Sequence, residues 1–492
     1  MTSAPAPGNG GAAAPVIPFG DGGPATRNSP GAGRTVAVIG VGYVGLPTAA
    51  TLAHLGHRVT CGDADLRKVA MLQGGHVPIV EEHLEALVQD GQAAGRLRFV
   101  AGAAAAVDGA EFVFLCVPTP QAEDGSADLS YVEAVAEEIA PHLAPGTVIV
   151  NKSTVPVGST LVVERVLGRH DVTVVSNPEF LREGTAVPDS LHPERIVVGA
   201  ADQAAAARVG ELFAGTHAPL LITDAATAET IKYASNAFLA TKLSFVNAVA
   251  GLCEAVGADV RDVILGLGYD KRIGFEFLRP GPGWGGSCLP KDTRALVFIG
   301  EQAGYDFSFL KGAIATNEEQ FARVVDKVAR AVAGASAAPA DPDGSPAARL
   351  NGAVVAVWGL TFKAGTDDLR NSPAVEVVRR LVAAGATVRA FDPTVAVGDG
   401  QPSGPVAGLA GIAGPGDDTG WDGSVRAYPD AYAACDGAAA VVVLTEWDEF
   451  RWLDFKEVRA RLTSPVVVDA RNLLDPSQLR RLGFDYTGIG RR

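Results

Sequence analysis

The chain is short of basic residues and cysteine, and it contains no long unbroken apolar run. Lys and Arg total 41 against 56 Asp and Glu, which gives a formal net charge of −15. A field of that sign repels nucleic acid phosphates and acidic lipid headgroups. No stretch of the sequence approaches the ~20 consecutive apolar residues that cross a bilayer. We therefore expect neither nucleic acid nor a membrane as a partner.

The five cysteines are odd in number and never form a C-x-x-C pair. This pattern argues against a disulfide framework and a structural zinc site, and no metal is expected. Residues 1–33, rich in Ala, Pro and Gly, lack the basic and apolar regions of a signal peptide. We expect a cytoplasmic protein whose residues 1–33 form a disordered tail.

The length of 492 residues exceeds what one hydrophobic core usually supports, which is about 250–300 residues. Beyond residue 34, apolar strand-like runs alternate with helical patterns. This alternation predicts an α/β fold with two Rossmann-like, doubly wound parallel-sheet domains. A Pro-free, Ala-rich segment over 226–256 predicts a long central helix joining them. The expected parts are a dinucleotide-binding domain over 34–225, a central helical region over 226–333, a linker over 334–351 and a second α/β domain over 352–492.

A glycine motif follows the first strand-like run. Gly40, Gly42 and Gly45 form G-x-G-x-x-G at the start of a helical pattern, and Asp63 ends the next strand-like run. Glycines allow close approach of a pyrophosphate to backbone amides, and an acid at this offset binds an adenosine ribose. The acid disfavours a 2′-phosphate, so the motif predicts NAD rather than NADP. Lys68 is a further candidate for the ribose or phosphate, although a solvated surface lysine fits equally well.

A second unusual segment surrounds Cys288. Four glycines lie within residues 281–286, and Lys291 and Asp292 follow the cysteine. A flexible backbone can wrap closely around a ligand, and a cysteine beside a lysine at a helix start favours the thiolate. We predict a nucleophilic Cys288. The other four cysteines are expected to be inert core residues.

Two further pairs are spaced four residues apart. Lys232 and Asn236 would share one face of the long helix, where both could donate hydrogen bonds to an oxyanion. Glu179 and Glu183 show the same spacing. From spacing alone, each pair is equally compatible with ordinary polar surface positions.

Taken in order, these segments resemble the UDP-glucose/GDP-mannose dehydrogenase family from about Arg34 to Arg471. The motifs are VIGVGYVG, NKSTVPVGST, SNPEFLREGTAVPDSLHPERIVVG, AETIKYASNAFLATKLSFVN, GWGGSCLPKD and GLTFKAGTDDLRNSPA. The resemblance implies an N-terminal NAD domain, a C-terminal domain that binds the nucleotide sugar, and a homodimer formed through the central helix.

The resemblance also implies a reaction. The C6 hydroxyl of a nucleotide sugar would be oxidised to a carboxylate with two NAD, through a thiohemiacetal and then a thioester on Cys288. Lys232 and Asn236 match the family's oxyanion-stabilising pair, and Thr154, Glu179 and Asp292 match positions that orient or deprotonate water. By the same likeness, the cofactor positions are Gly40, Gly42, Tyr43, Val44, Gly45, Asp63, Lys68, Pro118, Thr119, Thr154, Lys291 and Arg370. The substrate positions are Glu179, Phe180, Leu181, Arg182, Glu183, Lys232, Asn236, Arg272, Phe277, Leu278, Arg279, Gly285 and Lys363, with Arg471 near the uridine or cofactor.

The substrate expected from the resemblance is UDP-glucose, which would be converted to UDP-glucuronate. Leu289 also occurs at this position in GDP-mannose enzymes, so GDP-mannose stays open. Ser287 replaces the histidine usual in enzymes that act on N-acetylhexosamine nucleotides, which argues against those substrates. A two-electron hydroxyacid dehydrogenase and a non-enzymatic nucleotide-binding protein are the remaining alternatives.

Overall fold

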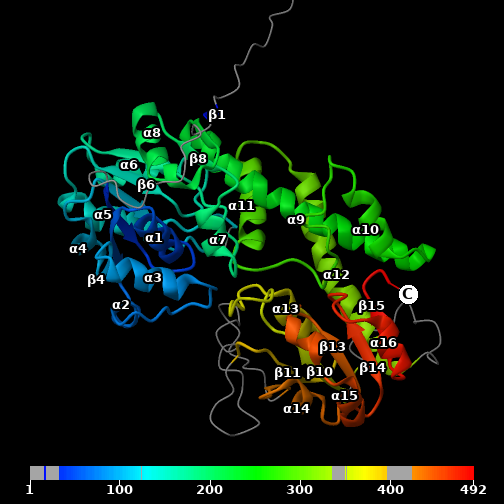
Figure 1. The fold of residues 1–492 in the computed structure, drawn as a ribbon. Helices are drawn as coiled ribbons and strands as arrows, with labels where there is room; N and C mark the ends of the chain where they lie inside the picture. The colour runs from blue at the N-terminus through cyan, green and yellow to red at the C-terminus, as the bar shows by residue number, and fades with distance from the viewer. Residues whose placement is uncertain are drawn as a thin grey trace, which may run out of the picture. The chain divides into compact units, whose positions relative to one another are not determined.

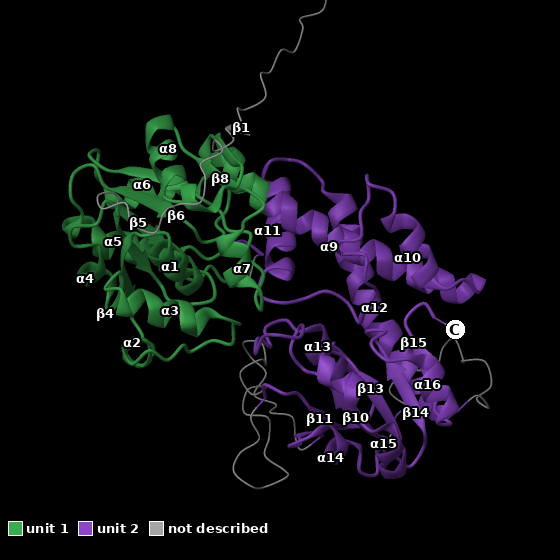
Figure 2. Ribbon diagram, viewed as in Figure 1, with its two compact units in different colours: residues 1–122, 127–232 green, residues 123–126, 233–492 purple. Residues whose placement is uncertain are grey.

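The computed structural model describes residues 16–17, 33–122, 125–334, 350, 352–395 and 424–491 (Figure 1). Its contacts divide the chain into two compact units (Figure 2). Unit 1 comprises residues 1–122 and 127–232, and unit 2 comprises residues 123–126 and 233–492. The boundary lies inside the long central helix, between Lys232 and Tyr233. The region expected over 226–333 therefore belongs mostly to the same unit as the C-terminal sheet.

Unit 1 is built on a nine-stranded sheet with the order β1-β9-β8-β7-β6-β5-β2-β3-β4. Neighbouring strands are parallel except at β7/β8 and at β1/β9. The strands are β1 Val16–Ile17, β2 Thr35–Ile39, β3 Arg58–Asp63, β4 Leu97–Ala101, β5 Phe112–Leu115, β6 Val148–Asn151, β7 Thr173–Ser176, β8 Ile196–Gly199 and β9 Leu220–Thr223. The sheet thus agrees with the predicted doubly wound fold.

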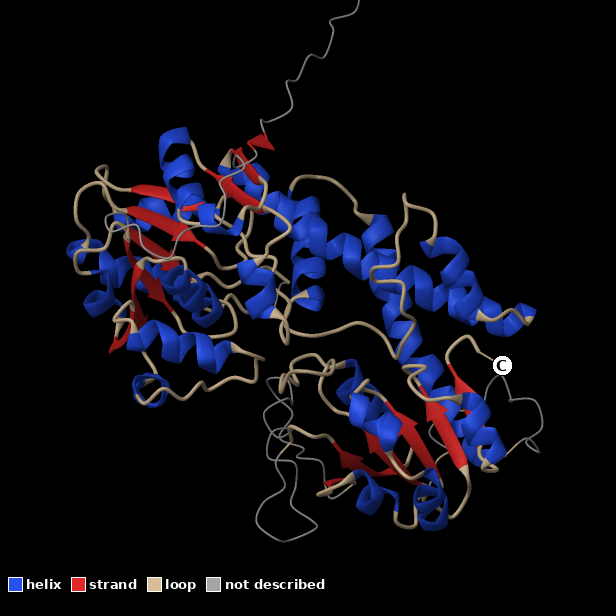
Figure 3. Ribbon diagram, viewed as in Figure 1, coloured by secondary structure: helices blue, strands red, loops and turns tan. Residues whose placement is uncertain are grey.

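Helices cover both faces of this sheet, because its central strands are apolar on both sides (Figure 3). One core lies under α1 Gly45–His54, α2 Leu66–Gln73, α3 Leu84–Ala93, α7 Ala186–Leu191 and α8 Gln203–Glu211. The other lies under α4 Ala103–Val107, α5 Ser130–Ile139 and α6 Ser159–Leu167. With helices on both faces, the carboxyl ends of the strands are where a doubly wound sheet binds its ligand.

The predicted central helix is α9, Ala225–Val256. Contrary to the expectation from unbroken apolar runs, α9 is long and apolar enough to cross a membrane by length and composition alone. Within the described residues it contributes to the unit 2 core, through Ala250 and Cys253. It also buries polar side chains, because Ser244 donates a hydrogen bond to the Ala313 carbonyl and Asn247 accepts one from the Gly281 amide. These contacts are those of a core helix.

Unit 2 contains a six-stranded, wholly parallel sheet with the order β12-β11-β10-β13-β14-β15. Its strands are β10 Val354–Trp358, β11 Thr387–Phe391, β12 Val425–Ala427, β13 Ala440–Val443, β14 Val466–Asp469 and β15 Asp485–Gly488. Its helices besides α9 are α10 Val260–Gly268, α11 Leu289–Gln302, α12 Ser308–Ala333, α13 Pro373–Ala383, α14 Ala431–Cys435, α15 Phe455–Arg461 and α16 Pro476–Arg481. Core residues of α12 and α13 pack on one face of the sheet, and those of α14, α15 and α16 on the other.

Most of the expected tail over 1–33 and of the linker over 334–351 lies outside the described residues. Within the tail, Val16–Ile17 forms strand β1 and pairs with β9.

Candidate functional site

The glycine motif forms the turn between β2 and α1 in unit 1. Gly40 has φ 94°, and a Cβ there would lie 2.6 Å from the Cys116 carbonyl oxygen, while a Cβ on Gly45 would collide with the Gly40 carbonyl. At Gly42 no atom of the described residues lies within 4 Å of such a Cβ, so the missing side chain leaves open space beside the turn. This is the cradle that a pyrophosphate needs.

The first turn of α1 carries no side-chain cap. Its N-cap residue Val44 makes no side-chain hydrogen bond, so the helix presents backbone amides to a bound anion. Asp63 closes the other side of the turn, since its carboxylate accepts hydrogen bonds from the Val41 amide at 2.9 Å and the Asp65 amide at 2.8 Å. Lys68 lies half-buried on α2, and Tyr43 is half-buried in the turn. The residues present therefore fit a dinucleotide.

Thr119 and Thr154 meet beyond the ends of the neighbouring strands β5 and β6. Both are buried, and Thr119 Oγ1 donates a hydrogen bond of 2.8 Å to the Thr154 carbonyl. Pro118 is exposed next to them. The structure thus brings these three predicted residues to the carboxyl edge of the sheet, where doubly wound folds bind ligands.

Glu179 and Lys232 form a buried ion pair in unit 1. Lys232 Nζ lies 2.8 Å from Glu179 Oε1, and the two side chains are only 4% and 5% exposed. Burial opposes the charge of this carboxylate, but Lys232, the Leu181 amide and Lys152 hold the pKa of Glu179 below its usual value. The carboxylate of Glu179 is therefore kept ionised beside Lys232 and out of water.

The segment after Glu179 forms the wall beside this pair. Phe180 lies under two cations, with Arg195 3.8 Å and Lys232 5.5 Å from the ring centroid. Arg182 is bound through its guanidinium to Asp189 at 2.6 Å. Leu181 and Glu183 are half-buried.

Lys152 is a functional candidate that the sequence analysis missed. It is buried directly after β6, and its Nζ donates a hydrogen bond of 3.0 Å to Asn177 Oδ1. The signal was a lysine placed between an apolar strand and Thr154, inside the quoted motif NKSTVPVGST. Lysine is rarely buried without a carboxylate partner, so this position is unusual.

Cys288 lies at the start of α11 in unit 2, as predicted, and serves as its N-cap residue. It is partly exposed and lies 3.6 Å from Ser287 Oγ. The other cysteines are buried, as expected; burial raises the pKa of Cys116 and of Cys435 to about 12. A thiol at those two positions stays protonated, and Cys288 is the one cysteine of the five that is not buried.

Asp292 lies one helical turn after Cys288 and contacts two of the predicted site residues. Asn236 Nδ2 donates to one carboxylate oxygen at 2.6 Å, and Lys291 Nζ lies 2.6 Å from the other. Asp292 is fully buried, and its backbone amide donates to the Cys288 carbonyl. Asn236 and Lys232 share one face of α9, since they are four residues apart.

The glycine-rich segment before Cys288 has a packing role in unit 2. A Cβ on Gly285 would collide with the Asn371 carbonyl oxygen, so glycine is required there by close backbone approach. Phe277 has a positive φ of 60°, rare for a non-glycine residue. Leu278 is buried and Arg279 is exposed.

Four further predicted residues make contacts within unit 2. Arg272 is exposed and binds Asp270, and Arg370 binds Asp368. Lys363 Nζ lies 5.4 Å from the centroid of the neighbouring Phe362 ring. Arg471 is held by the carbonyls of Leu444 and Phe362.

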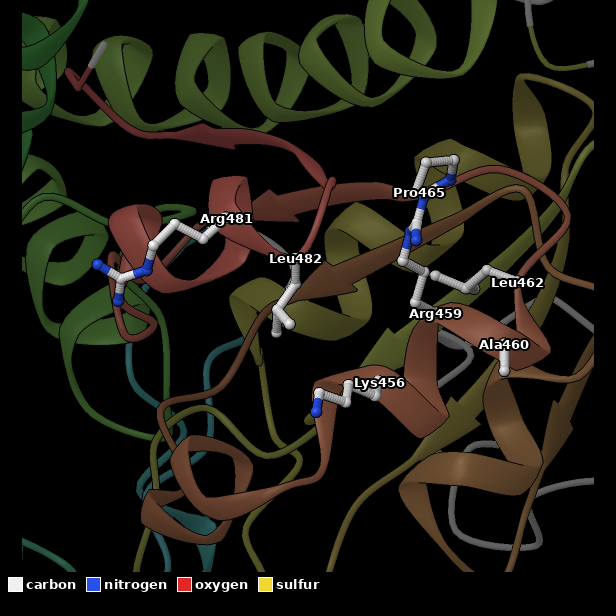
Figure 4. Close-up of a pocket in the computed structure, with 7 residues that line it drawn as sticks. All are labelled: Lys456, Arg459, Ala460, Leu462, Pro465, Arg481 and Leu482. Carbon is white, nitrogen blue, oxygen red and sulfur yellow. The ribbon is translucent and has the colours of Figure 1, made fainter.

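A pocket of about 580 Å³ lies elsewhere in unit 2. It is formed by α15, α16 and Pro465, and none of the predicted residues line it (Figure 4). Its three basic side chains, Lys456, Arg459 and Arg481, point in different directions in that view. Among the described residues, no group of three His, Cys, Asp or Glu side chains could hold a metal ion.

Comparison with protein families accounts for most of the chain. Residues 34–217 match the NAD-binding domain of the UDP-glucose/GDP-mannose dehydrogenase family, residues 226–319 its central domain and residues 356–476 its UDP-binding domain.

Individual relatives extend over nearly the whole length. A UDP-glucose 6-dehydrogenase from Pseudomonas aeruginosa is 42% identical, covering 93% of this chain and 97% of its own. UDP-glucose 6-dehydrogenase TuaD from Bacillus subtilis is 40% identical, covering 93% of each. The solved UDP-glucose dehydrogenase from Pyrobaculum islandicum superposes with a TM-score of 0.79 at 36% identity, covering 94% of this chain and 98% of its own. A UDP-D-ManNAc dehydrogenase from Pyrococcus horikoshii gives a TM-score of 0.77 at 26% identity, covering 93% and 99%.

Proposed function

Because the chain belongs to the UDP-glucose/GDP-mannose dehydrogenase family, we propose that it oxidises UDP-glucose to UDP-glucuronate with two NAD. The substrate follows the relatives of 37–42% identity, which are UDP-glucose 6-dehydrogenases. The observation that carries the chemistry is the partly exposed Cys288 at a helix start, one turn from the buried Asn236–Asp292–Lys291 cluster.

We assign the residues as follows. NAD bound at the Gly40–Gly45 turn supplies the hydride acceptor for each of two oxidations. Cys288 Sγ adds to the C6 aldehyde, forming a thiohemiacetal whose oxidation leaves a thioester. Water then attacks the thioester carbon, and the thiol leaves with a proton as the carboxylate is released. A primary alcohol loses four electrons in this sequence, two in each oxidation.

The two polar clusters suit the charges that develop on C6 oxygen. Lys232 and Asn236 are amine and amide donors on one face of α9, as oxyanion stabilisation requires. Glu179 and Asp292 are carboxylates held by cations, Lys232 and Lys291, and suit the activation of water. We assign the orientation of that water to Thr154.

The substrate assignment is tested by measuring NADH formation with UDP-glucose, GDP-mannose and UDP-N-acetylhexosamines. We expect UDP-glucose to be preferred, with two NADH formed per UDP-glucuronate. Preference for GDP-mannose would replace the substrate but keep the chemistry. One NADH per sugar with free aldehyde would indicate a two-electron dehydrogenase, and binding without NADH would indicate a nucleotide-binding protein.

Replacing the nucleophile tests the covalent route. Cys288→Ser should lower kcat by about 10³-fold or more, because an alcohol at that position is not an effective nucleophile. Cys253→Ala, which removes a buried thiol on α9, is the matched control and should keep kcat. Steady turnover of Cys288→Ser near the wild-type rate would refute the thioester.

The assembly we propose is a homodimer through α9. Phe238, Phe245 and Leu252 are 66%, 55% and 59% exposed and recur every seven residues, so they form one apolar stripe. In the single chain this stripe is uncovered, which favours a second copy. We expect the wild type to have twice the monomer mass by light scattering and Phe245→Glu to shift it toward monomer. An unchanged mass in Phe245→Glu would contradict the interface.

We also propose that the protein works in the cytoplasm. The reaction needs a reduced Cys288 thiol, and the five cysteines are all free in the structure. Cell fractionation followed by immunodetection tests this location.

A further inference from the structure

Lys152 has unusual surroundings for a lysine. Its side chain ends on Asn177 Oδ1 at 3.0 Å and lies 5.3 Å from the centroid of the Phe213 ring. Among the described residues, no carboxylate lies within ion-pair distance of its Nζ. Moving an ammonium group from water to a site with one amide oxygen and an aromatic ring costs free energy. A lysine at this position therefore points to a role other than packing.

Asn177, the partner of Lys152, lies beside β7 and β8, which pair through a single pair of residues. Strands β7 and β8 pair antiparallel through Ser176 and Gly199 alone, whereas β6 and β7 pair along their whole lengths. The Asn177 side chain adds a hydrogen bond between the two strands, because its Nδ2 donates to the Val197 carbonyl at 2.7 Å. Its backbone amide also donates to the Asn151 carbonyl. Asn177 therefore links β6, β7 and β8, and Lys152 holds its side chain.

Glu179 follows Asn177 by two residues, so whatever holds Asn177 also limits where Glu179 can lie. The charged or titratable groups acting on Lys152 are Cys116 after β5, Glu179 after β7 and Lys232 on α9. Burial lowers the pKa of Lys152 to about 8; Cys116 and Glu179 oppose that shift, and Lys232 adds to it. Lys152 is thus protonated below about pH 8 and loses its charge above it.

We propose that Lys152 is a positioning residue for the oxidation: its ammonium holds the Asn177–Glu179 segment in place and supplies a second positive charge that keeps Glu179 ionised beside Lys232. Lys152 acts through Glu179 and needs no contact with substrate. The kinetic part of this inference rests on the proposed function, whereas the structural part does not.

The experiment compares Lys152→Met, which removes the charge, with Lys152→Arg, which keeps it at all accessible pH values. At pH 7, Lys152→Met should lower kcat about 10- to 100-fold, the loss expected when a catalytic group is misplaced. Its KM values for NAD and UDP-glucose should stay close to those of the wild type.

The pH profile separates this role from a merely structural one. The kcat of the wild type should fall as the pH rises through about 8, because Lys152 then loses its proton. Lys152→Arg should move that decline to higher pH, and Lys152→Met should lack it. Lys327→Met is the matched control, since Lys327 is also largely shielded, at 12% exposed, but pairs with Glu254 in unit 2. It should keep the wild-type profile.

Hydrogen exchange provides a readout that needs no turnover. In Lys152→Met the hydrogen-bonded amides of Asn177 and Leu181 should exchange faster than in the wild type, while those of β2 and β5 keep their protection. If the wild type oxidises no sugar nucleotide, the proposed function fails but this comparison still tests the positioning. Unchanged exchange in Lys152→Met, or unchanged kcat and pH profile in an active enzyme, would overturn the inference.

Discussion

Gly40 after β2 and Gly359 after β10 occupy equivalent places in the two sheets and share a positive φ, at 94° and 91°. Each turn is also held by an acid from the neighbouring strand. Asp63 accepts a hydrogen bond from the Val41 amide, and Asp392 accepts hydrogen bonds from the Leu360 and Thr361 amides at 2.7 and 3.0 Å.

The two turns then diverge. In unit 1 the helix α1 begins at Gly45 without a side-chain cap, and open space surrounds Gly42. In unit 2 the helix α13 begins only at Pro373, and Ser372 caps it. An uncapped helix start with space beside it can receive a pyrophosphate, whereas a capped start cannot offer the same amide. The same strand–turn–helix plan thus leaves an uncapped helix start in unit 1 and a capped helix start in unit 2.

The largest effect is expected from Asp392→Ala. Asp392 is buried and also accepts hydrogen bonds from the Thr394 amide and from Trp447 Nε1. Its loss leaves several buried donors unpaired, at about 1–3 kcal/mol each, so the free energy of unfolding should fall by roughly 3 kcal/mol or more. Denaturant unfolding measures this. The folded Asp392→Ala variant should keep the wild-type Kd for NAD. A raised Kd would show that the unit 2 turn also contributes to NAD binding.

The next effect concerns Gly42→Val. A Cβ there has no described atom within 4 Å, so the valine side chain would occupy the space beside the turn; NAD should bind about 100-fold more weakly, or about 2.7 kcal/mol. Titration calorimetry gives the Kd, and the melting temperature without NAD should change little. Gly266→Val on α10, also with no atom near its Cβ, is the control. Equal Kd values for Gly42→Val and Gly266→Val would contradict the assignment of the Gly42 turn to pyrophosphate binding.

A smaller effect is expected from Asp63→Asn. The amide can still accept the bond from Val41 but lacks the negative charge that we propose binds the adenosine ribose. NAD should bind about tenfold more weakly, or about 1.4 kcal/mol, and the preference over NADP should shrink. Parallel titrations with both nucleotides measure the change. An undiminished preference for NAD would show that Asp63 only holds the turn.

The smallest effect is expected from Ser372→Ala. Ser372 Oγ accepts a hydrogen bond from the Ala374 amide and donates one to the Leu360 carbonyl. Losing a helix cap costs about 1 kcal/mol, which urea unfolding can detect. The Kd for NAD should stay unchanged, because this helix start is not expected to bind the cofactor.

The sequence predicted what local patterns encode. The glycine turn, Asp63 at the end of β3, the span of α9 and the helix start after Cys288 follow from periodicity, glycine chemistry and composition, and all were found. The family resemblance supplied the reaction and most site residues, which spacing alone left open.

The partners of the site residues were beyond local reasoning. Lys232 meets Glu179 across 53 positions and Asn236 meets Asp292 across 56, so only tertiary packing brings them together. The position of Lys152 after an apolar strand was a signal, but its partner Asn177 lies 25 positions away, so only the folded structure shows that the lysine is buried against it. The boundary inside α9 was also unpredicted, since a continuous helix carries no break in composition where the two units divide.

The most direct test follows the sulfur of Cys288 during turnover. Acid quenching of the enzyme within the first turnover with UDP-glucose and NAD, then peptide mass spectrometry, should show the peptide containing Cys288 carrying the mass of the oxidised sugar nucleotide. Glu179→Gln should increase that fraction, because a weaker base slows release by water. An unmodified Cys288 at every time point, while UDP-glucuronate accumulates, would contradict the account.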